Sequence, residues 1–365
     1  MPPETPHTVD TRELVDRFLG DAVARLASDL HLEPMADGYE LRFRIDGLLE
    51  TIERFDATAG RSAVSRLMVM AQLLTYRLDV PQEGRLELEL PALPEGVAHG
   101  RLEMRLAVMP TSNGLRAVVR LPAELTQPRS LDELHLPPTA LDGLKRFAKS
   151  NAGMLLLTGP AGSGKTTTIY ALLEYMVEHS QGLSIVSLED PVERDLPGVT
   201  QIEVSPFGEL TYERALRSML RQDPQVLALG EIRDDATATV ALQAALSGHR
   251  MISTLHAGTP GGAVSRLLEM GIEPYQITSA VCGVVAMRLI RAWNEEENRY
   301  QGRVPVAEFA VFDGEVRDAI LRRADAGTIQ SMLSAQDGYV TLRDAAAKIV
   351  ESGVTKQNEV DRVIG

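Results

Sequence analysis

Gly-Pro-Ala-Gly-Ser-Gly-Lys-Thr, residues 159–166, decides the fold of this chain of 365 residues. The stretch has glycine, glycine-lysine and threonine at the fixed positions of the phosphate-loop pattern Gly-x-x-x-x-Gly-Lys-[Ser/Thr]. The apolar residues 154–157 before it predict a buried strand, and residues 167–173 after it predict a helix. A strand, a glycine loop and a helix in this order predict an α/β fold that binds phosphate, because backbone N–H groups and the helix N-terminus can surround phosphate oxygens.

The loop predicts a site for ATP and Mg²⁺. Lys165 is expected to reach the β- and γ-phosphates, and the hydroxyl of Thr166 is expected to bind Mg²⁺. A glycine-rich turn that binds nothing is the alternative, and the strand and helix on either side of the loop disfavour it. The residues expected to bind the nucleotide are Gly159, Gly162, Ser163, Gly164, Lys165, Thr166 and Thr167.

From residue 141 onward, apolar strands alternate with helices, which predicts a parallel sheet with crossover helices. Ligands bind at the carboxyl ends of the strands in such sheets. Polar side chains follow three of the predicted strands and are therefore candidates for the site. The strands are expected at residues 154–157, 184–188, 226–229 and 250–255, and helices at 332–364.

Two of these strands end in carboxylates. Glu231 follows the strand at 226–229, and we expect it to be the general base that activates water. Many phosphate-loop ATPases have Asp where Gly230 stands, so Mg²⁺ is expected to draw on Glu189 and Asp190, with Glu189 and Glu231 reaching it through water. The alternatives are a glutamate that merely starts a helix at 231 and an Asp-Pro turn with solvated acids at 190.

A third strand, at 250–255, leads to His256. A histidine at this edge could sense the γ-phosphate or the charge state of the site. A structural histidine at a strand end, with its hydrogen bonds satisfied, is the alternative.

The first part of the chain predicts an α+β domain. Residues 14–26 and 64–74 have helical periodicity, whereas 39–45, 85–90, 101–108 and 115–121 alternate as antiparallel strands do. Asp46-Gly47 predicts a hairpin turn. The expected organisation is a flexible start at 1–12, the α+β domain at 13–121, a Pro-rich linker at 122–138 and the ATPase domain at 139–365.

The composition disfavours several classes of function. The net charge is −14 and only 4% of residues are aromatic, which argues against a nucleic-acid motor. One cysteine, Cys282, excludes an intrachain disulfide and a multi-cysteine zinc site; it lies in an apolar run and is expected to be a buried thiol. No signal peptide or apolar run of about 20 residues is present, so a cytoplasmic location is expected, with any membrane association peripheral.

Taken together, the motifs resemble those of the secretion ATPase superfamily, the motors of type II secretion and type IV pilus assembly. The resemblance runs from about residue 20 to the end of the chain. Gly230 in place of Asp is usual in that family. The matching segments are 159–170, 188–193, 216–224, 230–234, 247–256 and 265–271 in the second part, and 27–34, 42–47 and 81–85 in the first.

The resemblance implies a RecA-like core with a smaller PAS-like α+β domain, working as a homohexamer on a platform protein of the inner membrane. It also implies that Arg85 and Arg105 reach the nucleotide of a neighbouring subunit; simple ion pairs on strands are the alternative. The family's tetracysteine zinc loop is missing after 288–291, so no zinc is expected. An assembly or secretion motor is favoured, and a retraction motor or an assembly factor without turnover are the alternatives.

Overall fold

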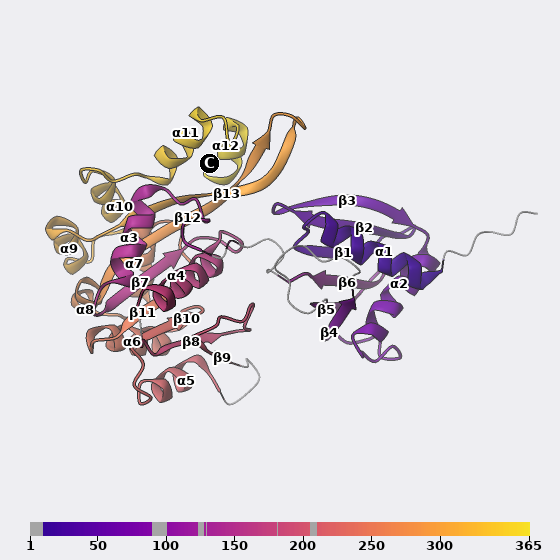
Figure 1. Cartoon of the computed structure of the whole chain (residues 1–365), viewed down its shortest axis with the longest axis horizontal. Coiled ribbons are helices and arrows are strands. Elements are labelled where there is room, and N and C mark those ends of the chain that lie inside the picture. Colours follow the sequence, from indigo (N-terminus) through magenta and orange to yellow (C-terminus); the bar gives the residue numbers. More distant parts are fainter. Residues whose placement is uncertain (1–9, 90–100, 123–127, 129, 181, 205–209) are drawn as a thin grey trace, which may run out of the picture. The chain divides into compact units, whose positions relative to one another are not determined.

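The computed structural model describes residues 10–89, 101–122, 128, 130–180, 182–204 and 210–365. The chain forms two compact units, Met1–Gln127 and Pro128–Gly365 (Figure 1). The flexible start expected at 1–12 lies outside the described residues up to position 9, and the expected linker lies outside them at 123–127 and 129.

The first unit is a six-stranded antiparallel sheet with two helices on one face (Figure 1). In β1, β2, β4, β5 and β6, buried hydrophobic side chains alternate with residues of the other face, which carries charged side chains. The strand order is β3-β2-β1-β6-β5-β4. The elements are α1 Thr11–Ala24, β1 Asp29–Pro34, β2 Tyr39–Ile45, β3 Leu48–Phe55, α2 Ala57–Met70, β4 Gln82–Glu89, β5 Arg101–Thr111 and β6 Gly114–Arg120.

Helix α2 differs from the prediction. It was expected at residues 64–74 but begins at Ala57, because the Asp56 side chain accepts hydrogen bonds from the backbone N–H groups of Thr58 and Ala59. It ends at Met70, and Gln72 then has φ of 57°, which breaks the helix. Apolar periodicity located the buried face but missed the polar first turn.

The second unit is a seven-stranded sheet covered by helices on both faces, the RecA-like arrangement of an α/β fold. The order is β13-β12-β7-β11-β10-β8-β9, and every pair except β12–β13 is parallel. The strands are β7 Gly153–Thr158, β8 Ile185–Glu189, β9 Thr200–Glu203, β10 Val226–Leu229, β11 Arg250–Leu255, β12 Val281–Asn294 and β13 Arg299–Ala310. The helices are α3 Pro138–Ala148, α4 Lys165–His179, α5 Tyr212–Met219, α6 Asp235–Leu246, α7 Pro260–Glu269, α8 Pro274–Ala280, α9 Gly314–Leu321, α10 Ala326–Ser334, α11 Leu342–Glu351 and α12 Gln357–Val363.

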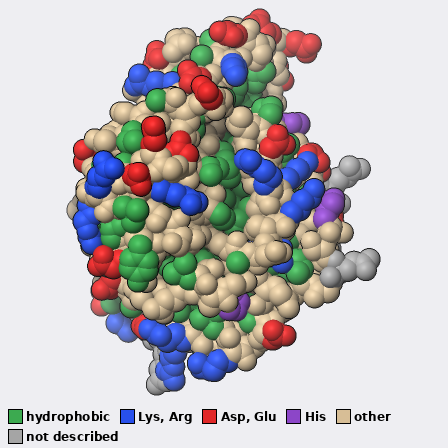
Figure 2. Space-filling view, turned by 90° about the vertical axis from the view of Figure 1, so that its left-hand side faces the viewer, with side chains coloured by type: hydrophobic (Ala, Val, Ile, Leu, Met, Phe, Trp, Pro, Cys, Tyr) green, Lys and Arg blue, Asp and Glu red, His purple; other side chains and the backbone are tan. Residues whose placement is uncertain are grey.

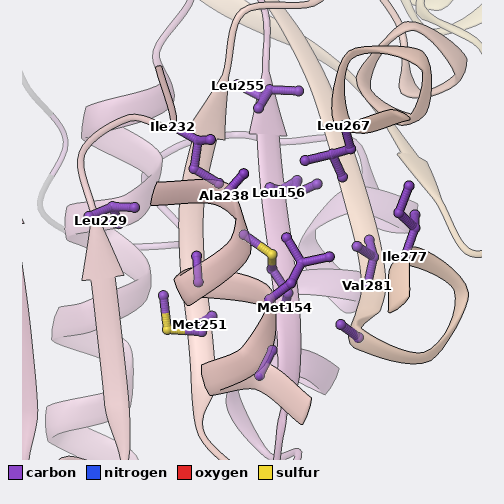
Figure 3. Packing of buried hydrophobic residues seen from close by; sticks show 14 of the residues in the cluster. Met154, Leu156, Leu229, Ile232, Ala238, Met251, Leu255, Leu267, Ile277 and Val281 are labelled. Carbon is purple, nitrogen blue, oxygen red and sulfur yellow. The ribbon is translucent and has the colours of Figure 1, made fainter. Parts of the chain in front are cut away.

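Both faces of β7 are buried, which explains its continuous apolar sequence. Met154 and Leu156 pack into the cluster on the face of α6 and α7, whereas Leu155 and Leu157 pack beneath α4 on the other face. Figure 3 shows the first cluster, in which Met154 and Leu156 lie beside side chains of β10, β11, α6, α7 and α8. The strand that leads into the phosphate loop is thus fixed from both sides.

The long hairpin of β12 and β13 was not predicted from the sequence. β12 pairs with β7 only from Val281 to Ala286, and its remainder pairs with β13 alone. A separate cluster packs this extension against α11 and α12. The extension begins at Met287, beside the phosphate loop, so that it contributes to the walls of the site.

Figure 2 shows one face of the second unit. Lys and Arg side chains alternate there with Asp and Glu side chains around a hollow lined by hydrophobic side chains. Charges of both signs interspersed in this way do not form the continuous basic strip that a nucleic-acid groove requires.

Candidate functional site

The phosphate loop joins the end of β7 to the start of α4, as predicted. Gly159, Gly162 and Gly164 have φ of 147°, 72° and 96°, values that favour glycine. A Cβ on Gly159 would lie 2.5 Å from the backbone oxygen of Met287 and 2.6 Å from the Ser163 Oγ. The loop therefore needs glycine at 159 for two reasons, its backbone conformation and the close approach of β12.

Lys165 folds back over the loop. Its Nζ donates hydrogen bonds of 2.8 Å to the backbone oxygens of Gly159 and Pro160. Burial lowers the pKa of the Lys165 amine, an effect that the attraction of Glu231 opposes. An anion in the loop would offer this ammonium group a stronger acceptor than the two carbonyls.

Strand order brings the predicted site residues of the second unit to one edge of the sheet. Thr158 lies opposite Leu255 across β7 and β11, while Leu229 of β10 lies opposite Ser253 and Leu188. Strands β7, β11, β10 and β8 therefore have their carboxyl ends at about the same height in the sheet. The residues that follow them are the loop with Lys165 and Thr166, then His256, Glu231, and Glu189 with Asp190.

Glu231 and His256 form a pair at this edge. The Glu231 Oε1 lies 3.1 Å from the His256 Nε2, and its Oε2 accepts a hydrogen bond of 3.2 Å from the Arg233 Nε. Arg233 also contacts Asp190, at 3.4 Å between Nη1 and Oδ2. The three predicted residues Glu231, His256 and Asp190 are thus joined, with Arg233 between the two carboxylates.

Glu189 is buried and held by three donors. The Tyr170 hydroxyl donates to its Oε2, while Ser187 Oγ and Gln201 Nε2 donate to its Oε1 at 2.5 and 3.0 Å. Burial, together with the hydrogen bond to Glu189, raises the pKa of Tyr170 far above its usual range, so the phenol remains a donor. A small cavity lies between Glu189 and Thr166 and is lined also by Ser187 and Gly230.

At Gly230 a side chain would be crowded by its neighbours. A Cβ there would lie 3.0 Å from the Tyr212 hydroxyl and 3.3 Å from the Leu188 backbone oxygen. The Gly230 oxygen accepts a hydrogen bond of 2.7 Å from Thr254 Oγ1. Tyr212 therefore occupies the space into which an Asp at this position would extend.

The edge also contains residues that the sequence did not single out for roles. Tyr170, Gln201 and Tyr212 contact or border the carboxylates, but they lie on α4, β9 and α5. Gln201 reaches Glu189 because β9 pairs in parallel with β8 and places it opposite Ser187. Of these residues, only the position of Tyr170 could be predicted from the sequence, because helical spacing places it one turn after the phosphate loop.

Arg85 and Arg105 lie in the first unit, opposite each other on β4 and β5. Arg85 Nη1 forms an ion pair of 3.1 Å with Glu103. Both arginines point to the face of the sheet that α1 and α2 leave uncovered, because Leu86 and Met104 point to the helices.

Cys282 corrects one expectation. Its side chain is exposed rather than buried, because Cys282 lies at the irregular start of β12, where the pairing with β7 shifts register. Its Sγ donates a hydrogen bond of 3.2 Å to the Met154 oxygen. Across the described ranges, no group of three or more His, Cys, Asp and Glu side chains is arranged to hold a metal ion.

The residues present fit a nucleotide with a metal ion. The Ser163 Oγ is buried within the loop and has no hydrogen-bond partner among the described residues. A phosphate oxygen would satisfy it. A Mg²⁺ ion bound with a nucleotide takes phosphate oxygens and water as most of its ligands, so Thr166 and the cavity toward Glu189 would suffice without a cage of side chains.

Comparison with known proteins finds relatives that belong to secretion systems. A family model described as Type II/IV secretion system protein matches residues 7–362. The type II secretion system protein HxcR of Pseudomonas aeruginosa is 34% identical over 386 residues, which cover 99% of this chain and 80% of that protein. The type II secretion system ATPase E of Vibrio cholerae is 34% identical over 387 residues, or 96% and 75% of the two chains.

Solved structures share the fold over nearly the whole chain. The Legionella pneumophila ATPase DotB has a TM-score of 0.77 at 23% identity, covering 99% of this chain and 97% of that one. The pilus retraction motor PilT, solved with bound ADP, has a TM-score of 0.66 at 25% identity, covering 94% and 95%. None of the helices in the described ranges combines the length and the apolar character that a bilayer span requires.

Proposed function

The chain belongs to the type II/IV secretion system protein family, and we propose that it hydrolyses ATP to drive protein secretion or pilus assembly. The observation that carries this proposal is the common edge of the second sheet. There the phosphate loop with Lys165 lies near a carboxylate, Glu231, that is paired with His256 at 3.1 Å. ATP hydrolysis needs both parts in one place, a loop that binds the phosphates and a carboxylate that activates water.

In the proposed reaction the loop binds the triphosphate of ATP. Lys165 leaves the Gly159 and Pro160 oxygens for the β- and γ-phosphates, and Ser163 Oγ donates to a phosphate oxygen. Thr166 would hold Mg²⁺, and Glu189, which lines the same small cavity, would reach the ion through water. When bound, Mg²⁺ neutralises charge on the phosphates.

Glu231 acts as the general base. It accepts a proton from a water molecule whose oxygen attacks the γ-phosphorus, while the bond from that phosphorus to the bridging oxygen of ADP breaks. His256 and Arg233 orient the carboxylate through their contacts with its two oxygens. Asp190 is linked to the base through Arg233, which makes it a positioning residue.

We propose further that the motor is a homohexamer, and that Arg85 and Arg105 of one subunit reach the nucleotide of the next. An arginine delivered across an interface stabilises charge on the transferring phosphoryl group and couples turnover to domain movement. The ring would act on a platform protein at the cytoplasmic face of the inner membrane. Relatives named for type II secretion, at 34% identity, favour secretion or assembly, and PilT at 25% keeps retraction as the second candidate.

The test is ATP turnover by the purified full chain, with Mg²⁺ and with a chelator in its place. The wild type should release phosphate only with Mg²⁺, and Lys165→Ala should lose both turnover and tight nucleotide binding. Lys149→Ala, which removes an exposed lysine at the end of α3, is the matched control and should behave as wild type. Equal turnover by Lys165→Ala and the wild type would sink the assignment.

A further inference from the structure

Arg288 of β12 lies at the edge of the second sheet that carries the phosphate loop. Its Nη1 donates a hydrogen bond of 2.9 Å to the Met287 backbone oxygen, and its Nη2 donates one of 3.1 Å to the Gly258 backbone oxygen. The same Met287 oxygen comes within 2.5 Å of a Cβ placed on Gly159, the first residue of the loop. Gly258 lies two residues after His256. The guanidinium therefore contacts the backbone on two sides, beside the start of the phosphate loop and beside the segment of His256.

The charge of Arg288 is partly buried and has no ion-pair partner in the part of the chain that the structure describes. Glu308, whose charge acts on Arg288, lies diagonally across β12 and β13 and accepts a hydrogen bond of 3.0 Å from the backbone N–H of Leu342 instead. Burial lowers the pKa of the Arg288 guanidinium, an effect that Glu308 opposes. Because a cation removed from water is costly without a paired anion, an anionic ligand at this place would stabilise Arg288.

Lys165 is held in the same way as Arg288. Its Nζ donates to the backbone oxygens of Gly159 and Pro160, so that carbonyls, not carboxylates, hold both cations. Burial is the main cause of the lowered pKa of Lys165, and the nearby charge of Arg288 lowers that pKa further. Two neighbouring cations held by carbonyls alone suit an anion with several charges, because hydrogen bonds to a charged acceptor are stronger than those to a carbonyl.

We propose that Arg288 binds the γ-phosphate of ATP held in the phosphate loop of the same chain. The inference rests on the proposed function, because it takes the triphosphate as the anion. The γ-phosphate is the group on which Glu231 acts in the proposed reaction, and Arg288 contacts the backbone two residues from His256, the partner of Glu231. A planar guanidinium can offer two N–H groups to one phosphate. Unlike Arg85 and Arg105, Arg288 would act within its own chain.

The experiment measures the affinity of the purified full chain, with Mg²⁺, for ADP and for a non-hydrolysable ATP analogue with an NH bridge between the β- and γ-phosphates. Arg288→Gln should weaken binding of the analogue by about tenfold to a hundredfold, the range of one charge-assisted hydrogen-bonding group. ADP lacks the γ-phosphate, so its affinity should stay within about twofold of wild type. A merely structural role of Arg288 would change both affinities equally.

The β12–β13 hairpin offers a matched control. Arg299 of β13 lies opposite Asn294, on the part of the hairpin that does not pair with β7. Its side chain is 62% exposed and forms an ion pair with Glu297. Arg299→Gln should bind both nucleotides as the wild type does.

A second variant decides the matter if Arg288→Gln does not fold. Arg288→Lys keeps the positive charge near Glu308, but its ammonium group cannot bind two phosphate oxygens in a plane. A smaller loss of affinity, confined to the ATP analogue, is therefore expected for Arg288→Lys.

Mixed hexamers test whether Arg288 acts within its own chain. Arg288→Gln and Lys165→Ala would both damage the part of the site that carries the phosphate loop. Mixing these two subunits should therefore restore no turnover, because every site keeps one of the two defects. Restored turnover would place the action of Arg288 on a neighbour's nucleotide and would contradict the inference.

Equal losses of affinity for ADP and the analogue, or no loss for either, would overturn the inference and leave the proposed function standing. If Lys165→Ala binds both nucleotides and hydrolyses ATP as the wild type does, the proposed function fails and this inference fails with it.

Discussion

At the scale of single residues, Glu189 and Glu231 differ in how far their surroundings enclose them. Glu189 is enclosed by Tyr170, Ser187 and Gln201, which occupy both of its oxygens. Glu231 is more open, with its side chain 22% exposed, and its partners are His256 and Arg233. A general base must be accessible to the attacking water. A carboxylate that only orients water around a bound metal ion can be held in place by its hydrogen bonds. The contacts therefore favour Glu231 as the base.

Glu231→Gln should keep ATP binding and lose hydrolysis. The amide has nearly the same shape as the carboxylate but cannot accept the proton of the attacking water, a loss of about 10²–10⁴ in rate. Nucleotide binding and phosphate release, measured on the same preparation, separate the two effects. If Glu231→Gln hydrolyses normally while Glu189→Gln does not, the base is Glu189.

Gly159→Ala should abolish tight nucleotide binding. The new Cβ would meet the Met287 backbone oxygen at 2.5 Å, and φ of 147° is strained for alanine, so the loop must change shape. Gly20→Ala in α1 is the control, because nothing lies within 4 Å of its Cβ and alanine favours a helix. ATP affinity of Gly159→Ala within twofold of wild type would contradict this view of the loop.

At the scale of elements, the β12–β13 hairpin depends on one buried carboxylate. Glu359 of α12 is 1% exposed and binds Arg291 of β12 at 2.7 Å and Arg362 at 2.6 Å. Burial alone would raise the pKa of Glu359, but these hydrogen bonds outweigh it and hold the value at about 2. Thr355 of the preceding loop also donates to the Arg291 oxygen at 2.7 Å.

Glu359→Gln should lower the free energy of unfolding by about 3 kcal/mol, because it leaves two arginines without their buried counter-charge. Since the folded pKa lies below the usual 4.5, the contribution of Glu359 is complete above about pH 5 and is lost as the pH falls toward 2. The variant should therefore lose this part of its acid sensitivity. Denaturant unfolding at pH 7 and pH 3 measures both the loss of stability and the loss of acid sensitivity. Glu351→Gln, at an exposed position on α11, is the control. Equal stability of Glu359→Gln and wild type would contradict it.

The elements also show what sequence could and could not predict. Apolar runs located β7, β10 and β11, because strands buried on both faces leave a continuous signal. The residues after them, Lys165, Glu231 and His256, share an edge because parallel strands all end there. The β12–β13 extension and the contact of Gln201 with Glu189 depend on register and on packing against distant helices, which no local pattern encodes.

At the scale of the whole molecule, the proposed motor would divide the nucleotide machinery between the two units of the chain. The second unit carries the phosphate loop and Glu231, whereas the first carries Arg85 and Arg105 on an uncovered sheet face. Such a division suits a ring in which one copy's arginines complete its neighbour's site. ATP would then draw a neighbouring domain inward, and product release would let it move out.

The most direct test of a site shared between subunits is the turnover of mixed hexamers. Arg105→Ala subunits should be inactive alone, as should Lys165→Ala subunits. When the two are mixed, some interfaces combine an intact loop with an intact arginine, and part of the wild-type turnover should return. If mixed hexamers form and activity never returns, Arg105 does not act on a neighbour's nucleotide, and the proposed shared site is wrong.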